Sequence, residues 1–189
     1  MRALITERLS RPPNAGSPAP AGLREAAVLV PLLDRPDGMT VLLLERTKHL
    51  THHPGQVSLP GGGIEAADAG ALDAALRETE EEIGIARRDV IVAGELEPIV
   101  TGTGFHITPF VGYVPVDAKL TLDRYEVERT FEVPLDLVVR ERCYERRIRR
   151  FQGADVAYYQ LSHNEHVIWG ATARILLNLG KRLGLEDDR

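Results

Sequence analysis

The chain has a single cysteine, Cys143, among its 189 residues. One cysteine excludes a disulfide within the chain and any zinc site built from several cysteines, so we interpret Cys143 as an ordinary strand residue. The sequence also lacks any run near the ~20 apolar residues that a membrane-spanning helix needs. Its N-terminus has no apolar core of a secretory signal. We therefore predict a cytoplasmic protein with no membrane partner.

Positive charge is in deficit, with 23 Lys and Arg against 28 Asp and Glu. Because nucleic-acid binding depends on cationic side chains that neutralise phosphates, this balance argues against a nucleic-acid partner. One segment, Arg140 to Phe151, is the exception, because it holds six arginines. Its alternating apolar residues predict a strand with exposed arginines. We favour an edge strand that its charges protect from aggregation, and a surface for an anionic substrate stays open as the alternative.

The length suits one domain that buries roughly 70% of the surface its unfolded chain exposes. The first 22 residues hold four prolines and two glycines. That composition favours a mobile or surface-draped arm over core structure. We therefore divide the chain into an arm, residues 1–22, and a domain, residues 23–185.

Hydrophobic periodicity predicts alternating strands and helices. Strands are expected at Ala26–Leu33 and Thr40–Arg46, joined by the turn-like DRPDG, and further strands at residues 57–60, 90–96, 107–114, 143–151 and 156–160. A helix is expected at Ala69–Ile83, with Gly84 at its C-terminal end. Its inner stripe is Leu72, Ala75, Leu76, Thr79 and Ile83, and the glutamates occupy the other side.

A second, amphipathic helix is expected to close the chain. Its apolar stripe surrounds Ile168, Trp169, Ile175 and Leu176, and we assign this stripe to the core, with a dimer interface as the alternative. Mixed strands with two main helices predict an α/β sandwich.

Three carboxylates stand together in the segment RETEEEIGI, which runs from Arg77 to Ile85. Glu78, Glu81 and Glu82 are spaced i, i+3 and i+4, so they neighbour one another on a helix surface. Such a run is by itself more often a solvated helix face than a metal site. Here the glycines 61–63 precede the helix, and glycine lets a ligand or metal approach the main chain. Since Mg²⁺ prefers carboxylate oxygens and bridges them to phosphates, the combination predicts a divalent-metal site for phosphate chemistry.

The stretch PGGGIEAADAGALDAALRETEEEIGI resembles the Nudix box, which reads Gly, five residues, Glu, seven residues, then Arg-Glu-U-x-Glu-Glu-x-Gly-U, with U aliphatic. The matching residues of its second half are Arg77, Glu78, Glu81, Glu82, Gly84 and Ile85, while Thr79 takes an aliphatic position. In the first half Asp68 stands where the glutamate is expected, and one extra residue separates it from Arg77. We interpret Asp68 as a helix N-cap instead.

A second motif, Leu42 to Gly62, resembles the block upstream of the Nudix box in coenzyme A pyrophosphatases. The matching residues are Leu42, Leu43, Arg46, Gly55, Pro60, Gly61 and Gly62. Leu44, Thr47, Thr51 and Leu59 depart from the block. Thr51 matters most because it replaces an arginine, which can grip phosphate bidentately. The resemblance extends from Ala26 to Leu183 and includes the closing segment His166 to Leu179.

The resemblance implies a Nudix-type α/β/α sandwich with a mixed β-sheet. It also implies metal-dependent hydrolysis of the diphosphate bond of coenzyme A or its derivatives, giving 3',5'-ADP and 4'-phosphopantetheine. The implied metal is Mg²⁺, with Mn²⁺ as the alternative. Its expected ligands are Glu78 and Glu82, assisted by Glu81 and the carbonyl of Gly62.

The resemblance assigns the catalytic roles to carboxylates and one arginine. Glu81 or Glu126 is expected to take the proton of the attacking water, and Arg77 to orient the glutamates. Glu126 lies in the segment Tyr125 to Leu135, which resembles the family's Glu-Val followed by Phe-Glu-Val-Pro-Leu, and it matches the first glutamate of that pattern. Glu132, in the same segment, is interpreted as structural.

Substrate contacts are expected from two loops. The first contributes Arg46, His53, Gly55, Gln56 and Gly61. The second, Thr101 to Phe110, contributes Phe105, and a plain hairpin is an equally good interpretation of it. We give His49, His52 and His53 a loop role because hard Mg²⁺ prefers oxygen to imidazole.

Two other functions and two oligomeric states stay open. The chain could hydrolyse another nucleoside diphosphate derivative, such as ADP-ribose, a dinucleotide or a nucleoside triphosphate. It could also be a non-catalytic Nudix domain that binds a nucleotide and regulates a partner. We expect a monomer or a homodimer with a small-molecule nucleotide substrate.

Overall fold

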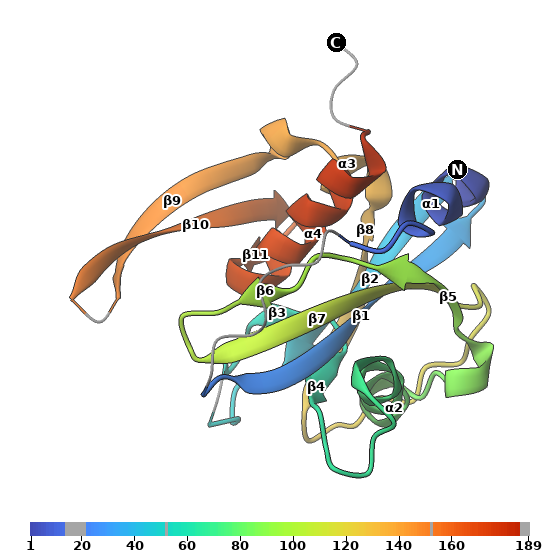
Figure 1. Ribbon diagram of the computed structural model, residues 1–189, viewed down its shortest axis with the longest axis horizontal. Coiled ribbons are helices and arrows are strands. Elements are labelled where there is room, and N and C mark those ends of the chain that lie inside the picture. The colour runs from blue at the N-terminus through green and yellow to red at the C-terminus, as the bar shows by residue number, and fades with distance from the viewer. Residues whose placement is uncertain (14–21, 52, 152, 186–189) are drawn as a thin grey trace.

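The main sheet is built around one long central strand. A computed structural model describes residues 1–13, 22–51, 53–151 and 153–185, and in these residues eight strands form a mixed sheet (Figure 1). The central strand β1 (Arg24–Arg35) pairs in parallel with β7 (Phe105–Tyr113). Its pairings with β2 (Gly38–Arg46) and β4 (Gly61–Gly63) are antiparallel.

Four short or peripheral strands complete this sheet. β3 (Val57–Ser58) and β8 (Val127–Pro134) pair with β2, while β5 (Ile91–Glu95) and β6 (Ile99–Val100) pair with β7. The strands expected at 26–33, 40–46, 90–96 and 107–114 are confirmed, and the one expected at 57–60 is shorter. β6 and β8 were not predicted as strands.

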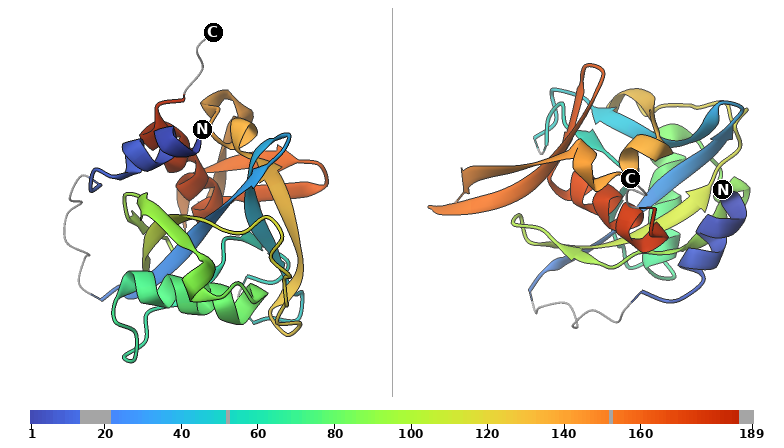
Figure 2. Two further views of the ribbon diagram at one scale, coloured as in Figure 1. Left: turned by 90° about the vertical axis from the view of Figure 1, so that its right-hand side faces the viewer. Right: turned by 90° about the horizontal axis from the view of Figure 1, so that it is seen from above.

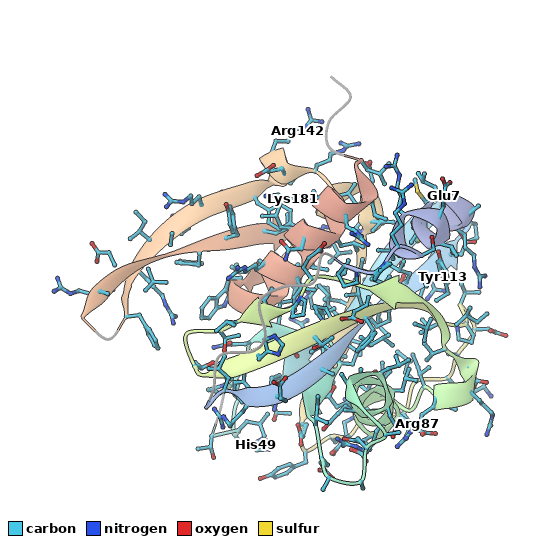
Figure 3. All side chains as sticks on the ribbon, viewed as in Figure 1. Glu7, His49, Arg87, Tyr113, Arg142 and Lys181 are labelled. Carbon is cyan, nitrogen blue, oxygen red and sulfur yellow. The ribbon has the colours of Figure 1, made fainter. Side chains whose placement is uncertain are left out.

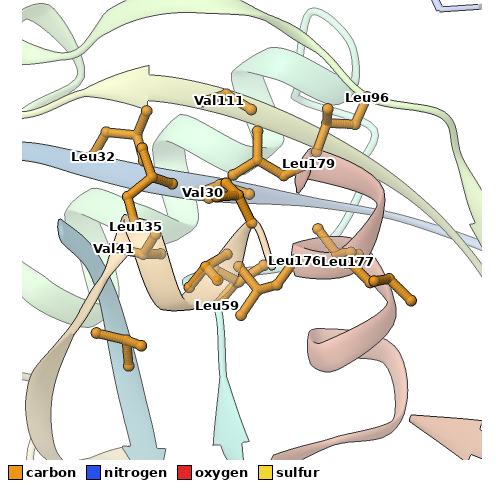
Figure 4. Close-up of a cluster of buried hydrophobic side chains, with 14 of the residues drawn as sticks. Val30, Leu32, Val41, Leu59, Leu96, Val111, Leu135, Leu176, Leu177 and Leu179 are labelled. Atoms are coloured by element: carbon orange, nitrogen blue, oxygen red, sulfur yellow. The ribbon is translucent and has the colours of Figure 1, made fainter. Parts of the chain in front are cut away.

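Helices cover both faces of the sheet (Figures 1 and 2). Helix α2 (Ala71–Ile83) packs on one face, in a cluster with Leu29 of β1. Helices α4 (Gly170–Leu183) and α1 (Arg2–Leu9) pack on the other face, in a larger cluster that includes Val30 (Figure 4). Neighbouring residues of β1 enter different clusters because successive strand side chains point to opposite faces. The predicted α/β/α sandwich with a mixed sheet is confirmed.

A separate three-stranded sheet projects from the body of the molecule (Figure 1). It consists of β9 (Tyr144–Phe151), β10 (Ala154–His163) and β11 (His166–Trp169), all antiparallel. The strands expected at 143–151 and 156–160 are confirmed. The closing segment begins as β11, and only from Gly170 onward does it become helical. Ile168, Ile175 and Leu176 of its stripe are buried, which confirms the core assignment.

The N-terminal segment contributes to the core, contrary to the expectation of an arm. Residues 2–9 form α1, whose Ile5 and Leu9 are 0% and 2% exposed. The Tyr113 hydroxyl donates to the carbonyl of Arg2 at 2.9 Å, and Figure 3 shows Tyr113 close to α1. The overall composition of the first 22 residues did not indicate this short helix, because their four prolines all lie after residue 11, beyond the end of the helix. Residues 14–21 of the expected arm lie outside the described residues, and the domain division stays a proposal.

Helix α2 begins at Ala71, two residues later than expected. Its N-cap is Gly70, which makes no side-chain capping hydrogen bond. Gly84 ends the helix with φ 75°, as predicted. Of the expected inner stripe, Ala75, Thr79 and Ile83 are buried, and Leu72 and Leu76 pack partly buried against the same cluster.

Three short helical turns connect the larger elements: α3 (Leu135–Val138) and the 3-10 turns Arg87–Asp89 and Glu141–Cys143. Cys143 therefore ends a turn directly before β9 and is not itself a strand residue. Among the described residues, no helix is long and apolar enough to cross a membrane.

Candidate metal and diphosphate site

The glycine loop holds the carboxylate of Glu82 in the protein interior. The backbone N–H of Gly61 donates to Glu82 Oε2 at 3.0 Å, and Glu82 is only 4% exposed. Gly61 has φ 149°, and a Cβ there would collide with the backbone of Ala27 and Val28. Only glycine brings this N–H so close to β1. The expectation that all three glutamates occupy the outer side of the helix is thus wrong for Glu82.

Burial changes the acidity of Glu82. Desolvation foremost, with the charges of Glu78 and Glu126, raises its pKa to about 8 against the opposing effects of the Gly61 N–H and Arg46. The carboxylate therefore favours either a bound proton or a nearby cation.

Glu78 lies one helical turn away, against the next glycine. A Cβ on Gly62 would fall 2.5 Å from Glu78 Cδ, so no side chain fits between this backbone and the carboxylate. Desolvation raises the pKa of Glu78, and the charges of Glu81 and Glu126 add to the shift. Glu78 and Glu82 are thus two carboxylates that share a partly desolvated site beside the glycine loop.

Arg77 joins the helix to the loop before it. Its guanidinium donates to Glu78 Oε1 at 2.9 Å, to Glu81 Oε2 at 3.1 Å and to the carbonyl of Gly63 at 3.1 Å. It also forms a two-pronged ion pair with Asp68, at 2.9 and 3.1 Å. These contacts, Asp68 first, raise the pKa of Arg77 and keep it charged. The contacts expected of an orienting arginine are present.

Asp68 is not the helix N-cap. Its side chain is 2% exposed, and it accepts the Glu65 N–H at 2.7 Å as well as the guanidinium of Arg77. These partners, Arg77 foremost, hold the pKa of Asp68 below its usual range. The cap assignment failed because the extra residue in the box places Asp68 in the loop, three residues before the first helical position. Its position where the box expects a glutamate was the signal for a role at the site.

Glu126 reaches the site from a distant segment. Arg46 Nη2 lies 3.2 Å from Glu126 Oε2, while Arg46 Nη1 lies 3.5 Å from Glu82 Oε1. The N–H of Thr47 donates to the Glu126 carbonyl at 2.9 Å, and the Thr47 hydroxyl donates to the Tyr125 carbonyl at 2.7 Å. Arg46, expected to contact substrate, thus connects two of the predicted functional carboxylates.

Other expected substrate residues lie in the loop after β2. The Arg46 N–H donates to the Gln56 carbonyl at 3.0 Å, and Gly55, with φ 66°, donates to the Thr47 carbonyl at 3.3 Å. The side chains of His53 and Gln56 contact each other at 2.9 Å. Figure 3 shows His49 on the same loop, while His52 lies outside the described residues.

Phe105 is not brought to the carboxylates. It begins β7 and, by strand alternation, shares the face of Ile107, which packs in the cluster opposite α2. The guanidinium of Arg24 covers its ring, 3.9 Å from the centroid. The segment Thr101 to Phe110 is a hairpin turn followed by β7, closed by the Thr101 N–H bond to the Phe105 carbonyl at 2.9 Å.

The donor set at the glycine loop fits a divalent cation. Carboxylate oxygens are hard ligands, and a cation would relieve the repulsion and desolvation that raise the pKa values of Glu78 and Glu82. Within the described part of the chain, no three His, Cys, Asp or Glu side chains already converge on one point. The carboxylates are bridged by arginines instead: Arg77 contacts Glu78 and Glu81, and Arg46 contacts Glu82 and Glu126. The fit therefore rests on donor chemistry and burial.

Comparison with known proteins identifies the family of this chain. The profile described as the NUDIX domain matches residues 23–149. The chain belongs to the Nudix hydrolase family. It is 37% identical over 163 residues to a protein of Enterobacter sp. (strain 638) described as "Uncharacterized Nudix hydrolase NudL", covering 86% of this chain and 84% of that protein. The Escherichia coli K12 protein of the same description is 37% identical over 170 residues, with the same coverage.

Solved structures share the Nudix fold. A MutT/nudix family protein from Enterococcus faecalis matches with a TM-score of 0.55 at 16% identity, covering 89% of this chain and 65% of that one. The Ap4A hydrolase of C. elegans, in a binary complex, matches with a TM-score of 0.51 at 20% identity, covering 59% and 80%. The interpretation as a Nudix hydrolase of a nucleoside diphosphate derivative is supported at the family level. The descriptions of these relatives do not name the coenzyme A branch.

Proposed function

We propose that this Nudix hydrolase cleaves the diphosphate bond of coenzyme A or a derivative, releasing 3',5'-ADP and 4'-phosphopantetheine. The observation that carries the chemistry is the burial of Glu82 under the Gly61 N–H, with Glu78 against Gly62. The assignment of coenzyme A as substrate is based on the upstream block, whose Arg46 lies against Glu82 and Glu126.

Glu78 and Glu82 are the proposed metal ligands, with Glu81 and the Gly62 carbonyl in support. Mg²⁺ fits this oxygen set, and Mn²⁺ is the alternative. Such a metal, when bound, supplies charge neutralisation at the diphosphate oxygens and lowers the pKa of an attacking water. Gly61 and Gly62 contribute by letting the main chain approach β1 and the Glu78 carboxylate closely.

The protein's own residues supply orientation and a proton acceptor. Arg77 restrains the Glu78 carboxylate through its hydrogen bond at 2.9 Å, which fixes the direction of a metal ligand. Two carboxylates are exposed enough to receive a proton from water: Glu81, 60% exposed, and Glu126, 41% exposed. Both stay candidates for the general base.

A second substrate class has one observation in its favour. Thr51 is exposed where the coenzyme A block has an arginine. Without that bidentate phosphate partner, selectivity for the 3'-phosphorylated nucleotide has to come from elsewhere in the chain. Hydrolysis of another nucleoside diphosphate derivative is therefore the alternative, and a cytoplasmic monomer or homodimer is the proposed form in either case.

The test incubates the purified protein with coenzyme A, ADP-ribose and NADH, each with Mg²⁺ or Mn²⁺, and identifies products by mass spectrometry. We expect 4'-phosphopantetheine and 3',5'-ADP to form fastest. Glu82→Gln is the control, and we expect it to lose more than about 100-fold in kcat, since loss of outer partners alone costs roughly 10–100-fold at metal sites.

Each other result has a definite meaning. Full turnover by a folded Glu82→Gln protein would refute the metal assignment. Faster cleavage of ADP-ribose or NADH would keep the Nudix chemistry and reject coenzyme A. Binding without turnover of any substrate would favour the nucleotide-binding regulator.

A further inference from the structure

The projecting β9–β10 ribbon has one face rich in aromatic rings. Its register places Arg149 opposite Val156, and Arg147 opposite Tyr158, while Trp169 of β11 stands opposite Gln160 of β10. Paired residues of antiparallel strands point to the same side, so these side chains share a face. We call Arg149, Phe151, Tyr158 and Trp169 the aromatic–arginine face.

Three contacts connect these four side chains in a row. The guanidinium of Arg149 lies 5.0 Å from the centroid of the Phe151 ring and 5.1 Å from that of Trp169. Tyr158 meets Trp169 edge-on, with the ring centroids 5.8 Å apart. These distances are within the range of cation–π and aromatic contacts. Planar groups therefore lie together on this face of the ribbon.

Core packing does not account for this arrangement. The three rings are only partly buried, and Arg149 is exposed. Arg147 pairs with Glu145 at 2.5 Å, whereas Arg149 has rings, and no carboxylate, as its neighbours within the described residues. A cation that is kept among rings has its charge available for an anionic ligand.

The ribbon contacts the turn between β6 and β7, which is hydrogen-bonded to the start of β1. A Cβ on Gly102 would lie 3.4 Å from the Phe151 ring, so the ring packs on the turn between β6 and β7. The carbonyl of Gly104, in the same turn, accepts the N–H of Arg24 at 2.9 Å. β1 starts at Arg24, and within four residues it pairs with the glycines of β4.

A second connection runs through the base of the ribbon. Trp169 directly precedes α4, where the Thr172 hydroxyl donates to the Val57 carbonyl at 3.1 Å. Val57 belongs to β3, which continues through Pro60 into the glycine loop. Figures 1 and 2 both show the ribbon projecting on the same side as the β6–β7 turn. The aromatic–arginine face and the glycine loop are thus linked by packed elements on two sides.

The chemistry of the face defines its ligand. Bases stack on aromatic rings and on guanidinium planes, and arginine binds phosphate through paired donors. The ribbon carries four arginines, from Arg146 to Arg150, against Glu145 and Asp155, in a chain with a net charge of -5. A ligand that combines a planar base with extra phosphate charge complements both features.

We propose that the aromatic–arginine face binds the phosphorylated nucleoside end of the substrate, with the base stacked at Trp169 and a phosphate at Arg149. The proposal rests on the proposed function, because it assigns the part of the substrate that is remote from the cleaved diphosphate. In this proposal Arg149 supplies the arginine–phosphate contact that Thr51 cannot make. Arg149 and Trp169 are then residues that determine specificity.

Trp169 is the only tryptophan of the chain, which makes its fluorescence a direct probe of this face. The experiment titrates the intact protein with 3',5'-ADP and, in parallel, with 5'-AMP. We expect a saturable change in fluorescence, with tighter binding of 3',5'-ADP. No turnover is needed for this measurement.

The matched variants are Arg149→Gln and Arg150→Gln. Both remove one exposed arginine from β9, but the side chain of residue 150 points to the opposite face, in register with Asp155. We expect Arg149→Gln to weaken 3',5'-ADP binding about tenfold, the effect of losing one stacking or phosphate contact. Its KM for coenzyme A should rise similarly at nearly constant kcat, while Arg150→Gln stays within about twofold.

The outcomes separate this inference from the proposed function. No fluorescence response, or equal weakening in the two variants, overturns the inference even if the parent hydrolyses coenzyme A. Equal affinity for 3',5'-ADP and 5'-AMP overturns the phosphate assignment. Binding of 3',5'-ADP that depends on Arg149, in a protein that leaves coenzyme A intact, supports the face and refutes the proposed substrate.

Discussion

At the residue scale, Glu82 carries the largest electrostatic cost of the site. A buried carboxylate loses hydration that one backbone hydrogen bond replaces only in part. The Gly61 N–H and Arg46 lower this cost, yet the pKa still rises to about 8. We expect the same burial to make Glu82 sensitive to pH and, as a proposed metal ligand, to divalent cations.

We predict that Glu82 makes the metal-free protein less stable as pH rises. Below its ordinary pKa of 4.5 the group is protonated in both the folded and the unfolded chain. Above that value the unfolded chain loses the proton first, so the stabilisation is lost as pH rises through about 8. The free energy of unfolding, measured by urea denaturation with EDTA, should fall by up to about 1.4 kcal/mol per pH unit.

The control for this prediction is Glu82→Gln, which cannot titrate at this position. Its free energy of unfolding should depend less on pH between about 4.5 and 8, and excess Mg²⁺ should restore stability only to the parent. Parallel curves for the two proteins would contradict the assigned cause.

The ion pair of Arg77 and Asp68 shows that the spacing in the Nudix box can identify an acidic residue but does not reveal which side chain it contacts. The box placed an acidic residue near position 68, but only the loop geometry turns its carboxylate toward Arg77 at 2.9 Å. A capping role was the reasonable inference from a helix start, since Asp is a favoured N-cap. The actual start at Ala71 removes Asp68 from capping distance in sequence.

At the scale of elements, the proposed metal site depends on how closely β4 packs against α2. The backbone of Gly62 occupies the space that a side chain would need beside the Glu78 carboxylate. A methyl group there displaces the end of a flexible side chain, which costs little stability but moves a proposed metal ligand.

We therefore predict that Gly62→Ala lowers the affinity for metal strongly and the free energy of unfolding only slightly. Affinity for Mn²⁺, measured by isothermal titration calorimetry, should fall roughly tenfold or more, the scale of disturbed ligand support. Gly63→Ala is the matched control, because a Cβ there has no atom within 4 Å. Comparable losses in the two variants would argue against the contact between Gly62 and Glu78.

At the scale of the whole molecule, the N-terminal helix closes the larger core. Ile5 is fully buried, and a Cβ on Gly94 of β5 would collide with the backbone of Leu9. Helix α1 also packs against α4, far from the glycine loop (Figure 1). Its contribution should therefore be to stability and not to catalysis.

We predict that Ile5→Ala lowers the free energy of unfolding by about 2–4 kcal/mol, the usual cost of a large-to-small core change. For a chain of this size that corresponds to a fall in Tm of roughly 4–16 °C in a thermal scan. Leu120→Ala, at a side chain 37% exposed, should change Tm far less. A mobile N-terminus would leave Tm unchanged in both variants, and kcat should be unaffected in either case.

The sequence by itself determined the local patterns: the glycines before an acidic helix, the helix end at Gly84, and the strands around it. Each depends on residues close together in the chain, through backbone preference and hydrophobic period. It also identified Arg46 and Glu126 as candidates, but not that they meet.

Only the tertiary structure decided the burial of Glu82, the approach of Arg46 to Glu126, and the packing of α1 in the core. It also decided that Arg149 and Trp169 share a face, because that follows from strand register across three strands. Burial and register depend on which distant segments pack together, and a local sequence pattern does not specify those segments.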